Sequence, residues 1–110
     1  PAEIGNAGSF CKNPVIDRAR AERLAEAHPG LPLYPGGSPA TAKLSAAWMI
    51  DRCGWKGHRD GDAGVHDRHA LVLVNHGHAS GAQILALATR IRESVRQRFG
   101  IELEPEPAVV

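Results

Sequence analysis

The chain has 110 residues, of which 43% are hydrophobic and 23% charged, and its formal net charge is +1. This balance is typical of a single water-soluble globular domain. Because the charge is small and the arginines are spread along the chain, no basic surface for nucleic acid is expected. The longest purely apolar run, Ala70 to Val74, is far shorter than the roughly 20 residues of a membrane span, so we expect no membrane partner.

Cys11 and Cys53 are the only cysteines, and two such distant residues define neither a disulfide framework nor a zinc motif. We therefore expect reduced thiols in a cytoplasmic protein. The chain opens at Pro1 without an initiating methionine, which suggests that it was cut from something longer. A processed protein would look the same.

Three segments have the composition of helices. Residues 17–28, DRARAERLAEAH, are rich in helix formers. Ser45 is a suitable cap for a short second helix. Ser80 and Gln83 form a capping-box pair, and the helix that they begin should continue to Gly100. Its apolar stripe comprises Ile84, Ala88, Ile91, Val95 and Phe99.

The remaining segments predict strands and loops. The apolar run at 70–75 predicts a central strand that is buried on both faces. Residues 4–16 predict a glycine-rich turn that leads into an extended segment, and the prolines and glycines of 29–39 predict an irregular loop. Residues 55–64 should form a loop with short paired strands at its edges. The alternation at 101–110 predicts an edge strand that ends early.

These elements predict an α+β fold: a compact single domain with a small mixed or antiparallel sheet packed with about three helices. We expect it to be a monomer.

Residues 5–10, GNAGSF, present a serine hydroxyl on glycine-rich backbone. Glycines let the backbone approach a ligand closely, and Ser9 placed there can donate a proton or bind a phosphate. The ordinary alternative is a tight turn in which nearby backbone satisfies the serine. Lys12 can reach a phosphate, or it can simply point at water. Asn13 precedes a proline, and Asn-Pro pairs commonly begin turns.

Two further groups of titratable residues could carry chemistry. His66, His69, His76 and His78 surround the predicted central strand, but no HExxH or paired CxxC motif supports zinc there, so we expect no metal site. Glu104 and Glu106 lie in the proline-rich tail LEPEP. A stiffly held carboxylate is useful as an acid when it is desolvated, and only adds solubility when it is not.

Four segments, which are spread along most of the chain, resemble the same family: GNAGSFCKNPV, KLSAAWMIDRCGWKG, AGVHDRHALVLVN and GIELEPE. Their order and spacing are similar to the C-terminal region of UDP-N-acetylenolpyruvoylglucosamine reductase, a flavoenzyme of peptidoglycan synthesis. The resemblance implies that NADPH reduces FAD, and that the reduced flavin passes a hydride to UDP-N-acetylglucosamine enolpyruvate, which becomes UDP-N-acetylmuramate.

The resemblance also implies roles for single residues. Ser9 would donate the proton and Glu106 would assist as an acid. Asn13 would hold the diphosphate of the substrate together with His69, and Lys12 is a further candidate from its own chemistry. Relatives more often carry Gln or Glu at the position of His69. Gly8 would lie beside the cofactor.

The resemblance implies that residues 1–110 are a C-terminal substrate-binding domain whose FAD-binding domain is absent. We therefore expect the chain alone to be inactive and to bind FAD weakly or not at all. The alternative is a non-catalytic module that binds a nucleotide sugar or phosphate and keeps this fold without the chemistry.

Overall fold

A computed structural model describes residues 5–9, 11–68, 70 and 72–104, and for residues 5–9 it describes the backbone alone. Three helices occur in this part of the chain: α1 (Arg18–Ala27), α2 (Ala46–Arg52) and α3 (Gly81–Phe99). All the strand pairings in the same residues are antiparallel. The predicted α+β class and the three predicted helices are confirmed, but two sheets take the place of the single sheet expected.

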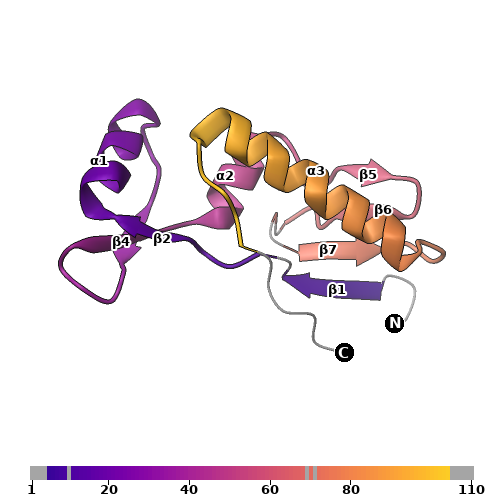
Figure 1. Ribbon diagram of the computed structural model, residues 1–110. Coiled ribbons are helices and arrows are strands. Elements are labelled where there is room, and N and C mark those ends of the chain that lie inside the picture. The colour runs from indigo at the N-terminus through magenta and orange to yellow at the C-terminus, as the bar shows by residue number, and fades with distance from the viewer. Residues whose placement is uncertain (1–4, 10, 69, 71, 105–110) are drawn as a thin grey trace.

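The first sheet has the order β1-β7-β6-β5, and the second has the order β2-β4-β3. The first consists of β1 (Gly5–Ser9), β5 (Arg59–Asp60), β6 (Ala63–Val65) and β7 (Val72–Asn75). The second consists of β2 (Val15–Asp17), β3 (Leu33–Pro35) and β4 (Thr41–Leu44). Figure 1 shows α3 lying along the first sheet and α1 beside the second, with α2 between them. We call these regions the α3 half and the α1 half.

The α3 half closely follows its sequence pattern. The Ser80 side chain accepts a hydrogen bond from Gln83 N, and the Gln83 side chain bonds back to the backbone of Ser80, so the capping box is present. Gly100 ends the helix with φ of 70°, a left-handed conformation that glycine adopts without strain. The helix buries one face: Leu87, Ala88, Ile91, Val95 and Phe99. Strand β7 lies between β1 and β6 and buries the neighbouring residues Leu73 and Val74, as predicted for a central strand.

The predicted glycine-rich turn is wrong, because residues 5–9 form strand β1 along β7. Asn6 lies opposite Val74 and Gly8 opposite Leu73, so the register shifts by one residue between them. Glycine in a strand often marks such an irregularity, and here two glycines allow a strand that bends where a turn was expected. The extended segment predicted after it is confirmed as β2.

The irregular loop predicted for 29–39 is also wrong in part, since Leu33–Pro35 pairs with β4. Strand β3 has one neighbour among the described residues, and an edge strand tolerates a proline that lacks an N–H. Gly36 follows β3 at a point where the backbone passes very close to the start of β4. A Cβ added there would lie 2.6 Å from Thr41 Oγ1 and 2.9 Å from Ala42 N, which explains why the position needs glycine.

The predicted edge strand at 101–110 is not seen in residues 101–104, and 105–110 lie outside the described residues. Ile101 and Leu103 are buried while Glu102 and Glu104 are exposed, so the predicted alternation is correct. A backbone bond from Lys12 N to Glu104 O at 2.8 Å joins this tail to the N-terminal segment. The loop at 55–64 does carry short paired strands, β5 and β6, as predicted.

One hydrophobic core joins the two halves. The Phe99 ring at the end of α3 lies 4.5 Å from the His28 ring and 6.2 Å from the Trp48 ring, measured between centroids. Arg20 of α1 donates a hydrogen bond to the carbonyl oxygen of Gly100. In the part of the chain that the structure describes, no helix is long and apolar enough to cross a bilayer.

Candidate functional site

A hollow of about 540 Å³ lies beside α2 and is the first part of the candidate site. Its lining joins the two halves of the molecule: Pro32, Tyr34, Ser45, Ala47, Trp48, Asp51, Lys56, Arg68, Ala70 and Val72. The volume is within the range of small-molecule sites, which is roughly 300–1,000 Å³. Tyr34 is 46% exposed, and its ring shares the hollow with two cationic side chains. We call this cavity the α2 hollow.

The first turn of α2 connects the α2 hollow to Asn13. Ser45 caps the helix by accepting a bond from Trp48 N at 3.1 Å. Asn13 Oδ1 accepts from Ala46 N at 2.9 Å. Because the first N–H groups of a helix have no partner within it, the two side chains stabilise its start. With its oxygen engaged, the Asn13 amide has its NH₂ group left to donate to a ligand.

Strand β1 brings the backbone of Ser9 to the same place. Ser9 lies opposite Val72 in the ladder between β1 and β7, and Val72 lines the α2 hollow. Gly8 is the next residue in the ladder and pairs with Leu73.

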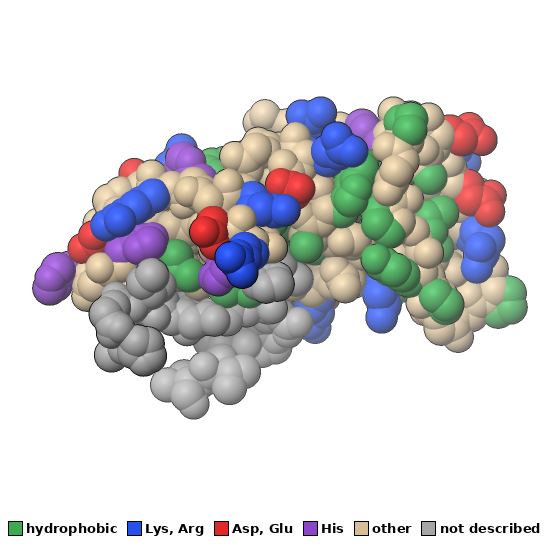
Figure 2. All heavy atoms as spheres, turned by 180° about the vertical axis from the view of Figure 1, so that it is seen from behind, with side chains coloured by type: hydrophobic (Ala, Val, Ile, Leu, Met, Phe, Trp, Pro, Cys, Tyr) green, Lys and Arg blue, Asp and Glu red, His purple; other side chains and the backbone are tan. Residues whose placement is uncertain are grey.

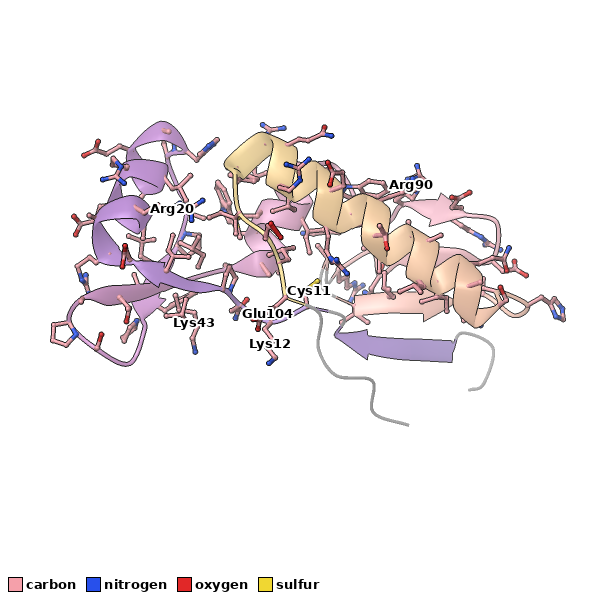
Figure 3. The ribbon with its side chains drawn as sticks, viewed as in Figure 1. Cys11, Lys12, Arg20, Lys43, Arg90 and Glu104 are labelled. Carbon is pink, nitrogen blue, oxygen red and sulfur yellow. The ribbon has the colours of Figure 1, made fainter. Side chains whose placement is uncertain are left out.

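A second cavity, the tail groove, has a volume of about 580 Å³. It lies between the segment around β2 and the tail after α3: Lys12, Asn13, Pro14, Val15, Ile16, Arg20, Gly100, Ile101, Glu102 and Glu104. Lys12 and Asn13, both predicted to contact phosphate, are on its wall. The Lys12 ammonium lies 3.7 Å from Glu104 Oε1. Figure 3 shows these two residues together at the junction of the N-terminal segment and the tail.

His69 and Glu106 lie outside the described residues, as does the side chain of Ser9. The structure therefore places Lys12 and Asn13 on the wall of the tail groove. It also joins Asn13 to the first turn of α2 and pairs the backbone of Ser9 with Val72 at the α2 hollow. Tyr34, Lys56 and Arg68 were not among the site residues predicted from the sequence. Their signal was weak, since one exposed tyrosine in a proline-rich segment and two scattered cations are common on any surface.

Figure 2 shows apolar side chains gathered on the α1 half of the face that it presents.

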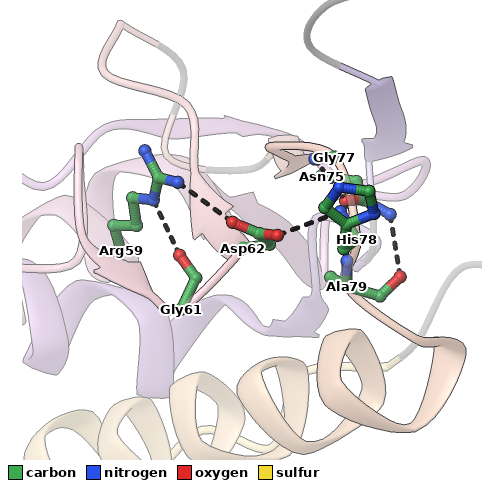
Figure 4. Close-up of polar contacts among 7 residues, drawn as sticks. All are labelled: Arg59, Gly61, Asp62, Asn75, Gly77, His78 and Ala79. Carbon is green, nitrogen blue, oxygen red and sulfur yellow. Dashed lines mark hydrogen bonds and ion pairs between the residues drawn. The ribbon is translucent and has the colours of Figure 1, made fainter.

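A hydrogen-bond network lies between β7 and α3, and His78 takes part in it through its backbone N–H. Asp62 Oδ1 accepts from Arg59 Nη2 at 3.1 Å, and Oδ2 accepts from His78 N at 3.0 Å. Asn75 Oδ1 accepts from the backbone of Gly77 and Ala79. Figure 4 shows this network, which closes the turn between β7 and α3. Within residues 5–9, 11–68, 70 and 72–104, no three His, Cys, Asp or Glu residues are grouped so as to hold a metal ion.

No disulfide joins Cys11, which is buried, and Cys53, which is half-buried. Burial raises the pKa of the Cys53 thiol, and a hydrogen bond with Ser94 and the charge of Arg98 offset that rise only in part. A thiol with a raised pKa is a poor nucleophile at neutral pH. Neither cysteine lines the α2 hollow or the tail groove.

Comparison with known proteins gives a consistent result. The model of the family described as "UDP-N-acetylenolpyruvoylglucosamine reductase, C-terminal domain" matches residues 1–110. Curated proteins named UDP-N-acetylenolpyruvoylglucosamine reductase are similar over nearly all of the chain. Those of Xylella fastidiosa (strain 9a5c) and Chromobacterium violaceum are each 58% identical over 110 residues. These residues are the whole of this chain, but only 31% of the length of the first relative and 32% of the length of the second. That of Pseudomonas aeruginosa (strain PAO1) is 62% identical over 107 residues, 97% of this chain and 31% of its own. The chain thus spans about a third of the length of these relatives.

Proposed function

Because the chain belongs to the family of UDP-N-acetylenolpyruvoylglucosamine reductase C-terminal domains, we propose that it is the substrate-binding part of such a reductase. The whole enzyme would use NADPH and FAD to convert UDP-N-acetylglucosamine enolpyruvate to UDP-N-acetylmuramate in peptidoglycan biosynthesis. Residues 1–110 would act as one substrate-binding domain of a cytoplasmic, monomeric enzyme.

The observation that carries the proposal is the meeting of three segments at the α2 hollow. Val72 lines the hollow and pairs with Ser9. Ser45 and Ala47 line it too, and the residue between them, Ala46, donates to Asn13. The residues proposed as proton donor and phosphate ligand therefore belong to segments that contact the lining of this cavity, which supports the proposal.

The chemistry of the α2 hollow suits a nucleotide sugar. An exposed aromatic ring such as that of Tyr34 offers a surface on which a base can stack, as exposed aromatic side chains do for single-stranded nucleic acids. Lys56 and Arg68 offer positive charge for a diphosphate. The Lys56 ammonium also forms an ion pair with Asp51, with 3.4 Å between Nζ and Oδ2. The Asn13 amide would donate to a phosphate oxygen, with His69 as a further donor.

The residues described fit FAD at one point only. Gly8 has no side chain and lies where the pairing of β1 is irregular, so a ligand can approach the backbone there. Their sheets are antiparallel and have no parallel βαβ unit with a phosphate-binding glycine loop, the usual site for a dinucleotide. We propose that FAD is held mainly by the rest of the enzyme, and that residues 1–110 alone are inactive and bind it weakly or not at all.

The flavin, when bound and reduced, would supply the hydride to the enolpyruvyl double bond. Addition of a hydride to one carbon leaves negative charge on the neighbouring carbon, which then needs a proton. Ser9 would donate that proton, and Glu106 would assist in the same acid step. A serine hydroxyl is a weak acid, so the site must stabilise the alkoxide that remains, through hydrogen-bond donors aimed at the oxygen.

The experiment is a Ser9→Ala change in the full-length reductase that contains this domain. We expect reduction of the flavin by NADPH to be unaffected. Oxidation of the reduced flavin by the enolpyruvyl substrate should fall by at least about 100-fold, the lower end of the contribution of general acid catalysis. Stopped-flow absorbance of the flavin measures both half-reactions. Turnover within a few-fold of the unmodified enzyme would refute the role of Ser9.

Titration of residues 1–110 with UDP and UDP-N-acetylglucosamine provides a second test. Binding to the isolated domain would support a nucleotide site in the α2 hollow. A Tyr34→Ala change should weaken that binding, whereas Val15→Ala is a matched control because Val15 is similarly exposed and does not line the hollow. Equal effects of the two changes would contradict the proposed stacking on Tyr34.

A further inference from the structure

The N-terminal segment and the C-terminal tail meet at one point of the molecule. Lys12 N donates to Glu104 O at 2.8 Å, and the Lys12 ammonium lies 3.7 Å from Glu104 Oε1. Figure 3 shows Cys11, Lys12 and Glu104 grouped below the end of α3. In the sequence, Ser9 comes three residues before this junction and Glu106 two residues after it. The junction therefore joins the two segments that carry the proposed acid groups.

Burial fixes the register of the two segments. Cys11 is 1% exposed and Leu103 is 4% exposed, while Lys12 and Glu104 next to them point to solvent. A slip of the tail by one residue would place the Glu104 carboxylate in the core and the Leu103 side chain in water, which costs free energy on both counts. The tail can thus pair with the N-terminal segment in one register.

We propose that Lys12 and Glu104 are positioning residues: together they hold the tail against the segment after Ser9, and the proposed acid step depends on that contact. The inference rests on the proposed function. It also gives Lys12 a different task from the one predicted from the sequence, because an ammonium engaged with Glu104 is not available to the diphosphate.

The parts of this junction differ in strength. The two charged side chains are 48% and 76% exposed, so water screens their attraction and the pair alone contributes little. The backbone bond and the buried Leu103 side chain hold the tail in register, while the charges limit how far its outer edge can move. Changes to the charges alone should therefore have a modest effect, whereas Leu103→Ala should have a larger one.

A double-mutant cycle in the full-length reductase tests the proposal. Lys12→Met and Glu104→Gln should each slow oxidation of the reduced flavin by the enolpyruvyl substrate by about two- to fivefold, the range of an exposed ion pair. The double variant should be no slower than either single variant, and the exchange of charges, Lys12→Glu with Glu104→Lys, should restore most of the rate. KM for the substrate and flavin reduction by NADPH should be unchanged.

Other results would overturn the proposal. A raised KM in Lys12→Met alone would indicate that Lys12 binds the diphosphate. Losses that multiply in the double variant, or an exchanged pair that recovers nothing, would show that the two residues do not act together. Glu102→Gln is the matched control, since Glu102 lines the same groove on the same tail and forms no described ion pair with Lys12; a loss as large as that of Glu104→Gln would also refute the proposal.

Ser9→Ala and Glu106→Gln belong in the same assay. If they retain turnover, the proposed function fails, and the positioning role fails with it. If they lose turnover while the exchanged pair shows no recovery, the positioning role fails alone.

Discussion

The α1 half and the α3 half are both a helix packed on a small antiparallel sheet, but they are stabilised differently. Helix α3 buries five side chains along its length, whereas Ala21 is the one fully buried residue of α1. Helix α3 is therefore stabilised mainly by the burial of apolar surface, and α1 gains less from burial. Because few buried contacts mean low local stability, we expect α1 to open more readily than α3. The α2 hollow, which lies between the two halves, therefore has a more stable wall on the α3 side and a less stable wall on the α1 side.

The largest effect should come from the core of the α3 half. Ile91 is 0% exposed and lies in the middle of α3. Ile91→Ala should lower the free energy of unfolding by about 2–5 kcal/mol, since it leaves a cavity as well as losing burial. Leu24→Ala in α1 should cost less, because Leu24 is only partly buried. Urea unfolding of residues 1–110 measures both, and a greater loss for Leu24→Ala would reverse our ranking of the two halves.

The next effect tests a close contact in the α1 half. Gly36→Ala should destabilise by about 1–3 kcal/mol, the usual cost of overpacking, because the new methyl group meets the backbone at Ala42 N. Gly81→Ala is the matched control: a Cβ there has nothing within 4 Å, and the position begins α3. The control should be neutral or slightly stabilising. Equal melting temperatures for the two variants would contradict the close contact between Gly36 and the start of β4.

A smaller effect compares the starts of the two long helices. Ser80→Ala removes a capping bond to Gln83 N at 3.1 Å and should cost about 1 kcal/mol. Asp17 stands at the corresponding position of α1 but makes no capping bond with its side chain, so Asp17→Ala should have almost no effect. Thermal unfolding would show the difference. A cost for Asp17→Ala as large as that for Ser80→Ala would mean that α1 is capped in solution.

The smallest effect concerns pH. Hydrogen bonds from Arg96 and then Gln97 lower the pKa of Glu93 on the exposed surface of α3. The folded state thus favours the charged carboxylate, and the resulting stabilisation is present above the ordinary pKa of about 4.5. It is lost as the pH falls through the lower pKa of the folded state. Glu93→Gln should lower the melting temperature slightly at pH 7 and have a smaller effect at pH 2. An equal effect at both pH values would exclude this origin.

The elements with long periodic patterns were predictable from the sequence. Helix α3 has a cap, an apolar stripe and a terminal glycine that agree with one another, and β7 is a continuous apolar run. Strands β1 and β3 were missed because their residues favour turns: β1 carries two glycines and β3 ends in Pro35. Their conformation comes from pairing with β7 and β4, which are distant in the sequence, so tertiary contacts outweigh local preference.

The candidate site was predictable only in part. The bond from Ala46 N to Asn13 joins residues that are 33 positions apart, and nothing in the Asn-Pro pair indicates such a partner. Tyr34, Lys56 and Arg68 gain meaning only when the fold places them around one cavity. Family resemblance supplied the roles of Ser9 and Glu106, because neither local pattern distinguishes a catalytic group from an ordinary turn or tail residue.

The placement of the two tryptophans gives this domain an intrinsic optical probe. Trp48 lines the α2 hollow, whereas Trp55 lies against α3, where its ring nitrogen donates to Ser94 at 2.7 Å and Arg90 lies 5.4 Å above its ring. A nucleotide that enters the hollow should quench the emission of Trp48 and leave that of Trp55 almost unchanged. With Trp55→Phe, fluorescence would then report occupancy of the hollow without a label, and Trp48→Phe would provide the silent reference.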